Sequence, residues 1–92
     1  REKVAYASTV ELSIYVHPEH RGKGIGSVLM GEIIAMAKGD ETVHTVVSVI
    51  TSGNAASEHL HEKFGFTFSG TIKEVGMKFG NYLDISNYYL IV

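Results

Sequence analysis

Residues 17–27 read His17-Pro18-Glu19-His20-Arg21-Gly22-Lys23-Gly24-Ile25-Gly26-Ser27. An alternating apolar and polar run over residues 10–16 precedes this stretch and predicts a strand. Residues 25–38 follow it and predict a helix. A strand, a glycine-rich turn and a helix in this order present the unpaired amide N–H groups of a helix N-terminus to a ligand.

The glycines and the two basic residues of this turn predict an anion as the ligand. Gly22, Gly24 and Gly26 allow positive φ and a close approach of the backbone to a bound group. Arg21 and Lys23 add positive charge beside the positive end of the helix dipole. We expect a pyrophosphate here, and the alternative is that the glycines only turn the chain.

Length and composition narrow the class of protein. The chain has 92 residues, 45% of them hydrophobic and 20% charged, as in one ordinary globular domain. A net charge of −2 argues against a nucleic-acid groove, and the absence of cysteine excludes a disulfide framework and a thiolate nucleophile. No apolar run approaches the roughly 18 residues of a membrane-spanning helix. Because nothing at the start resembles a signal peptide, we expect a cytoplasmic protein.

The first predicted strand has two different faces. Val10, Leu12, Ile14 and Val16 share one face and are expected to point to the core. Glu11 lies on the opposite face, with Ser13 and Tyr15. A carboxylate in such a position is ordinarily solvated, and it becomes chemically useful where its face lines a cleft.

The helix predicted over 25–38 has apolar residues at helical spacing and is expected to end at Gly39-Asp40. Ser27, Gly31 and Lys38 lie away from the predicted core-facing stripe. That stripe consists of Ile25, Val28, Leu29, Ile33 and Met36.

The β-branched run over 43–51 predicts a strand buried on both faces, parallel to the first strand through a right-handed crossover. Asn54 or Ser52 can cap a second helix that runs to Phe64, and Gly65 can close it. On this helix the residues expected to pack inward are Ala56, Leu60 and Phe64. The residues expected on a polar face are Asn54, Ser57, Glu58 and His61, with a plain surface histidine as the alternative for His61.

Residues 66–79 and 82–92 predict a long hairpin with its turn at Gly80-Asn81. Two nucleotide-binding motifs fail, because the glycines have neither P-loop nor Rossmann spacing. The pairs His17 with His20 and His59 with His61 lack a third metal ligand of suitable spacing, so no metal is expected.

Arg21-x-x-Gly24-x-Gly26 resembles the Gln/Arg-x-x-Gly-x-Gly/Ala loop of the GNAT-superfamily N-acetyltransferases. Other stretches, in order along nearly the whole chain, resemble its phosphinothricin and methionine sulfone acetyltransferase branch. They are Thr9-Val10-Glu11, Tyr15-Val16, Ser52-Gly53-Asn54-Ala55-Ala56-Ser57, Leu60-His61-Glu62-Lys63-Phe64-Gly65-Phe66 and Val75-Gly76-x-Lys78-Phe79-Gly80-x-Tyr82-x-Asp84.

The resemblance implies a mixed α/β fold, the C-terminal portion of a GNAT domain, and acetyl-CoA as the cofactor that serves as co-substrate. It implies Glu11 as the base that deprotonates the acceptor amine and His61 as the acid near the departing sulfur. The implied cofactor-binding residues are Tyr15, Val16, Arg21, Gly22, Lys23, Gly24, Ile25, Gly26, Ser27 and Asn54.

The implied acceptor is the primary amine of a small amino acid with a tetrahedral polar head, such as phosphinothricin, methionine sulfoximine or methionine sulfone. Tyr6 and Lys78 resemble residues that approach the substrate or a partner subunit. A homodimer or a complementing chain is the expected partner, with neither nucleic acid nor membrane.

The chain departs from the family in lacking the N-terminal half of the domain, so residues 1–92 are expected to form only the acetyl-CoA-binding portion. An open sheet edge would invite pairing with a second chain. We expect a fragment of a longer acetyltransferase, which alone binds CoA weakly and turns over poorly. The alternatives are a CoA-binding module without catalysis and an assembly half-domain.

Overall fold

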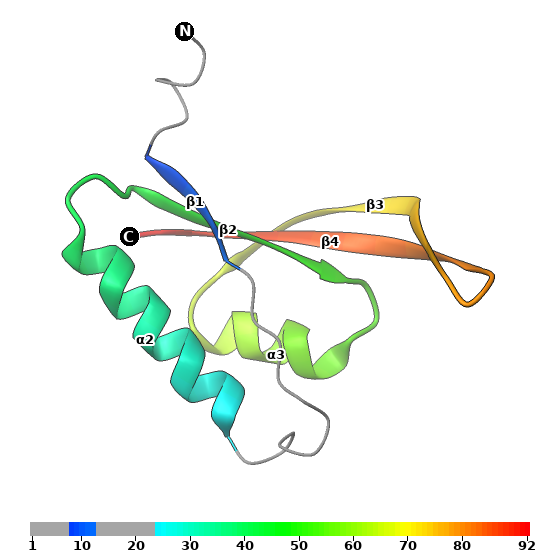
Figure 1. Cartoon of the computed structure of the whole chain (residues 1–92), viewed down its shortest axis with the longest axis horizontal. Helices are drawn as coiled ribbons and strands as arrows, with labels where there is room; N and C mark the ends of the chain where they lie inside the picture. Colours follow the sequence, from blue (N-terminus) through cyan, green and yellow to red (C-terminus); the bar gives the residue numbers. More distant parts are fainter. Residues whose placement is uncertain (1–7, 13–23) are drawn as a thin grey trace, which may run out of the picture.

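The computed structural model describes residues 8–12 and 24–92. The predicted order of strand, helix, strand, helix, strand, strand is confirmed (Figure 1). Residues 13–16 of the predicted first strand and most of the glycine-rich turn lie outside the described residues. The elements are β1 (Thr9–Leu12), α2 (Ile25–Gly39), β2 (Thr45–Thr51), α3 (Ala55–Lys63), β3 (Thr67–Lys78) and β4 (Asn81–Ile91).

The strands of the described part form one mixed sheet in the order β1-β2-β4-β3. β1 runs parallel to β2, as the crossover predicts, and β4 is antiparallel to both β2 and β3. Figure 1 shows α2 and α3 on the same side of this sheet. The described residues therefore make two layers, a sheet and a pair of helices.

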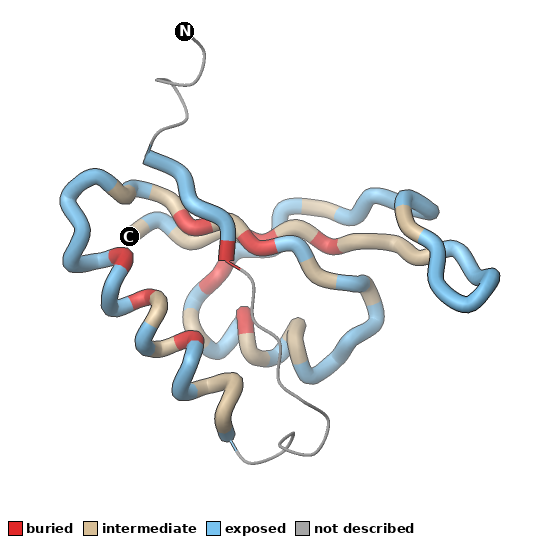
Figure 2. The backbone as a smooth tube through the Cα atoms, in the orientation of Figure 1, coloured by how far each residue is buried: buried red, intermediate tan, exposed pale blue. Residues whose placement is uncertain are grey.

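The core lies between these two layers, and Figure 2 shows the buried positions, in red, on both helices and on the strands they cover. Met30 of α2 and Val46 of β2 are its most deeply buried large side chains, at 0% and 1% exposed. Half-buried apolar residues such as Leu60 and Phe64 pack around it. The buried apolar residues are Leu12, Met30, Ile34, Ala37, Val46, Phe66 and Tyr88.

The predicted apolar stripe of α2 was wrong by a rotation of about one residue, because the buried residues are Met30, Ile34 and Ala37. Val28 is 60% exposed and Met36 is 74% exposed, and of the predicted residues Ile33 packs against the core. Apolar residues lie on most sides of this helix, so its sequence is compatible with more than one inward face. Packing against the sheet and α3 determines which face is buried.

Contacts between the helices complete the inward arc of α2. A Cβ atom at Gly31 would lie 3.7 Å from Cε1 of Phe64, and Nζ of Lys63 donates a hydrogen bond of 3.0 Å to Oγ of Ser27. Gly31 and Ser27 lie outside the predicted apolar stripe, but Phe64 and Lys63, at the end of α3, lie against them. Gly39 also belongs to the helix, whose C-cap is Asp40.

The strands bury one face rather than two. In β2, Val46 and Ser48 are buried, whereas Val49 on the other face is 44% exposed. The prediction of burial on both faces was therefore wrong for the described part of the chain. In β1, Leu12 is buried as expected, but Val10 is 37% exposed and does not join the core.

The second helix begins and ends as its sequence predicts. Oδ1 of Asn54 caps it by accepting a hydrogen bond of 3.2 Å from the Ser57 amide. Gly65, with φ of 87°, ends it, and the Phe66 amide donates to the His61 carbonyl across the end. Two predictions fail here, because Ala56 is exposed and His61 is buried.

The β3–β4 hairpin extends beyond the helices as an arm (Figure 1). Lys78 pairs with Asn81, so its turn is centred on Phe79 and Gly80, one residue before the predicted turn. Both have positive φ, 51° and 79°, as a two-residue hairpin turn of type I′ requires. Phe79 is 90% exposed at this tip.

The rotation of α2 can be tested with two matched substitutions. Met30→Ala leaves a cavity in the core and should lower the free energy of unfolding by about 2–5 kcal/mol. Met36→Ala removes an exposed side chain and should change it by less than about 0.5 kcal/mol. Urea denaturation measures both, and equal losses would contradict the observed packing.

Candidate active site

The N-terminus of α2 has no side-chain cap among residues 8–12 and 24–92. Gly24 occupies the N-cap position, with φ of 76° and ψ of 7°. The Gly24 carbonyl accepts a hydrogen bond of 3.1 Å from the Val28 amide, which is the first bond of the helix. The amides before Val28 have no carbonyl inside the helix to which they can donate. The first turn contains no acidic residue, and a Cβ at Gly24 would meet no atom of the described residues within 4 Å. These properties suit an anion.

Helix α3 adds a positive charge at this end of α2. The hydrogen bond from Nζ of Lys63 to Oγ of Ser27 places an ammonium group beside the first turn of α2. In the sequence, Lys63 stands within a stretch that resembles the family, and no pattern there points to a binding role. The two residues are 36 positions apart, so no local pattern could reveal the contact.

His61 lies in the core, 5% exposed, rather than on a polar surface. Its Nδ1 is 2.7 Å from the Ser57 carbonyl oxygen, which can only accept, so Nδ1 carries the hydrogen. Its Nε2 is 2.7 Å from Oγ of Ser48 on β2, and in the neutral ring Nε2 accepts the hydroxyl hydrogen. Both ring nitrogens are therefore engaged.

Two aromatic rings enclose this imidazole. The ring of Phe66 stands edge-on at 5.0 Å between centroids, and the ring of Tyr88 lies tilted at 5.1 Å. Together with Ser48 they hold the ring of His61 in one orientation. Ser48 has no signal in the sequence, because it is one polar residue inside a β-branched run.

Two other predicted site residues lie elsewhere: Asn54 at the N-terminus of α3 and Glu11 on β1. Oδ1 of Asn54 serves the helix cap, and its Nδ2 is a second polar group that can donate to a ligand. Glu11 is exposed and pairs with Val47. Leu12 pairs with Ser48, so alternation puts Glu11 on the sheet face opposite His61.

The structure thus brings Gly24, Ile25, Gly26 and Ser27 together at the end of α2, with Lys63 beside them. It does not bring Lys78 to them, because Lys78 lies near the tip of the arm, with Nζ 5.5 Å from the Phe79 ring centroid. The remaining predicted site residues lie outside the described part of the chain. They are Tyr6, Tyr15, Val16, Arg21, Gly22 and Lys23.

Over residues 8–12 and 24–92, no three His, Cys, Asp or Glu side chains gather in a way that could hold a metal ion. No helix in the same ranges has the length and apolar character needed to cross a membrane.

The sequence profile of the acetyltransferase (GNAT) family matches residues 3–66, and the chain belongs to this family. Its mixed sheet and the order of its elements agree with those of solved members. The predicted family and fold class are thereby confirmed.

Two curated relatives and one crystal structure show the extent of the similarity. The chain is 44% identical over 81 residues to L-amino acid N-acyltransferase MnaT of Escherichia coli, covering 88% of this chain and 46% of the relative. It is 44% identical over 88 residues to phosphinothricin N-acetyltransferase of Streptomyces coelicolor, covering 96% and 51%. A phosphinothricin acetyltransferase from Sinorhizobium meliloti, solved in complex with AcCoA, superposes with a TM-score of 0.91 at 35% identity, covering 100% and 49%. The chain spans about half the length of these relatives.

Proposed function

We propose that this chain is the acetyl-CoA-binding portion of an N-acetyltransferase, which transfers the acetyl group to the primary amine of a small amino-acid-like acceptor. The observation that carries the proposal is the uncapped N-terminus of α2, where Gly24 opens the first turn and Lys63 adds positive charge. Family membership supplies the chemistry that such an anion site serves. The solved relative in complex with AcCoA supports the cofactor.

Acetyl-CoA carries a pyrophosphate, which residues Arg21 to Ser27 would hold through backbone N–H groups and two basic side chains. We assign Lys63 to the same group, because its ammonium already lies at Ser27. Asn54 would donate through Nδ2 to the cofactor. Tyr15 and Val16 would bind its pantetheine arm through their main chain, as the family resemblance implies.

The assignment of Lys63 can be tested by titrating CoA into the 92-residue chain in a calorimeter. Lys63→Met should weaken binding by roughly 3–10-fold, since it removes one charge-assisted contact of about 1 kcal/mol. Lys38→Met, at the other end of α2, is the matched control and should bind as the unchanged chain does.

Two outcomes of this titration contradict the proposal. Absence of CoA binding would favour an assembly half-domain instead. Equal binding by the Lys63 and Lys38 variants would remove Lys63 from the site while leaving the rest of the proposal in place.

The proposed reaction is direct attack of the neutral amine on the thioester carbon. The amine must lose a proton first, and we assign Glu11 as the base, acting through a water. Glu11 is exposed and projects from the sheet face that the described helices leave open, so an acceptor can approach it. The carbon–sulfur bond breaks as the carbon–nitrogen bond forms, and the sulfur leaves as a thiolate.

We assign the proton for this thiolate to His61, as the family resemblance implies. Because His61 and Glu11 lie on opposite faces of the sheet, the acid and the base would act on the thioester from opposite sides. The Nδ1 hydrogen is held by the Ser57 carbonyl, so the ring would act in its imidazolium form and give up a second hydrogen carried on Nε2. Ser48 lies in that path: its hydroxyl would turn so that Oγ accepts from Nε2 while its own hydrogen passes to the thiolate. Histidine can carry out this transfer near neutral pH.

Glu11→Gln in the intact protein should lower kcat by about 10²–10⁴-fold, because it removes the general base. CoA affinity should stay within twofold, and Glu41→Gln, an exposed residue after α2, is the matched control. The assay follows thiol release with phosphinothricin, methionine sulfone and simple polyamines as acceptors. In the same assay Ser48→Ala should lower kcat while the KM for acetyl-CoA is unchanged.

A CoA-binding module without catalysis is the competing function. It would bind CoA, release no thiol with any acceptor and show no dependence on Glu11.

The names of the curated relatives favour small amino-acid acceptors over polyamines. We also place the protein in the cytoplasm.

We propose a second copy of the chain as the partner of the β3–β4 arm. The arm carries the most exposed aromatic side chain of the described part, Phe79, with Met77 and Tyr82 at 60% and 64% exposed beside it. Such apolar surface on an extended hairpin suits an interface. Lys78, remote from the cofactor end of its own chain, could then approach the site of the partner.

Sedimentation velocity of the intact protein tests this interface. Phe79→Ser should weaken dimerisation by at least tenfold, because it removes the most exposed apolar side chain of the arm. Val28→Ser, an exposed apolar position on α2, is the control and should leave dimerisation unchanged. A monomer at all concentrations, or a dimer insensitive to Phe79→Ser, would overturn the proposal.

A further inference from the structure

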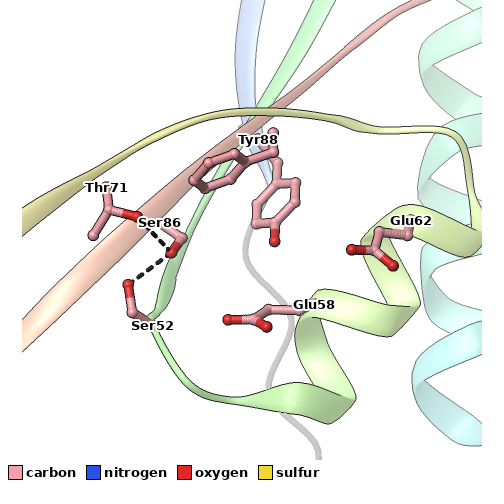
Figure 3. A pocket seen from close by; sticks show the side chains of 7 residues that line it. Ser52, Glu58, Glu62, Thr71, Ser86 and Tyr88 are labelled. Carbon is pink, nitrogen blue, oxygen red and sulfur yellow. Dashed lines mark hydrogen bonds between the residues drawn. The ribbon is translucent and has the colours of Figure 1, made fainter.

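A pocket of about 380 Å³ lies between α3 and the β3–β4 hairpin (Figure 3). It lies on the helix side of the sheet, on the face opposite Glu11, and its wall residue Tyr88 also packs on the ring of His61. The lining residues are Ser52, Glu58, Glu62, Phe68, Thr71, Ser86 and Tyr88.

Two carboxylates dominate the charge of this pocket. Glu58 and Glu62 are one helical turn apart on α3, and Figure 3 shows both side chains reaching toward the pocket. One oxygen of Glu58 accepts from the Gly53 amide at 3.0 Å, which leaves its charge in place. None of the described lining residues is Lys or Arg. Lys63, which follows Glu62 on α3, donates to Ser27 of α2 and does not line the pocket.

The hydroxyl of Tyr88 is a second, independent feature. The residue is only 4% exposed, and Figure 3 shows its oxygen directed into the pocket toward the two glutamates. No hydrogen bond joins this oxygen to another group of residues 8–12 and 24–92. Since no fully enclosed polar side-chain atom there lacks a partner, the oxygen is accessible from the pocket. Burial, and then the negative charges of Glu58 and Glu62, raise the pKa of Tyr88.

The other polar groups of the pocket are satisfied among themselves. Oγ of Ser86 lies 2.7 Å from Oγ of Ser52 and 3.5 Å from Oγ1 of Thr71. Phe68 is 55% exposed and meets the Tyr88 ring edge-on at 5.5 Å, which makes an apolar aromatic wall. The pocket therefore combines two anions, one unused hydroxyl and one aromatic wall.

We propose that this pocket binds a primary alkylammonium ion, with its charged head at Glu58, Glu62 and the Tyr88 hydroxyl and its alkyl chain against Phe68. An ammonium group donates three hydrogen bonds, which matches two carboxylates and one hydroxyl oxygen. An aromatic wall attracts such a cation and covers its methylene groups. A bare metal ion fits less well, since only two carboxylates face the pocket.

The test is an NMR titration of the chain with 1,4-diaminobutane, without CoA, observing the tyrosine rings and the Thr71 methyl group. Saturable shifts should occur at Tyr88 and Thr71. Glu62→Gln should weaken binding at least fivefold, and Tyr88→Phe, which keeps the ring, at least threefold. Glu32→Gln on the exposed surface of α2 should bind within twofold of the unchanged chain.

The neutral analogue 1,4-butanediol, of the same length, should leave these signals unchanged. The proposal is overturned if the diol shifts the same signals, if the diamine shifts are not saturable, or if Glu62→Gln and Glu32→Gln bind equally. Because the titration contains no CoA, its failure leaves the proposed acetyltransferase function untouched.

Discussion

The hydrogen bonds of the His61 imidazole hold helix α3 to the centre of the sheet. One nitrogen donates to the Ser57 carbonyl within the helix, and the other bonds Ser48 on β2. Leaving either buried nitrogen without a partner would cost about 1–3 kcal/mol. Phe66 and Tyr88 pack on the ring, so the helix can neither rotate nor slide without breaking several contacts at once.

Because the rotation of α3 is fixed, each of its other polar residues faces a definite neighbour. Asn54 caps its N-terminus, and Lys63 in its last turn bonds Ser27 at the N-terminal end of α2. Glu58 and Glu62, on another side, face the pocket beneath the hairpin. One short helix therefore supports the proposed cofactor site on one side and the proposed ammonium site on the other.

The sequence predicted the helices and strands well and their inward faces poorly. Asn54 and Gly65 bound α3 as predicted, since a cap and a positive φ are local properties of the chain. His61 was placed on a polar face because its neighbours Ser57 and Glu58 are polar. Its burial depends on Ser48, which pairs with it only after the strand and helix pack together.

The sequence by itself determined the order of the elements, the caps of α3, the hairpin and the motif that resembles the family. These follow from φ preferences and from periodicity over a few residues. Only the tertiary structure decided which side of α2 faces inward, because that helix is apolar all round and the Phe64 ring is what meets Gly31. It also decided that Lys63 bonds Ser27 and that Tyr88 lines one pocket with Glu58 and Glu62. These groups are distant along the chain, and only packing brings them together.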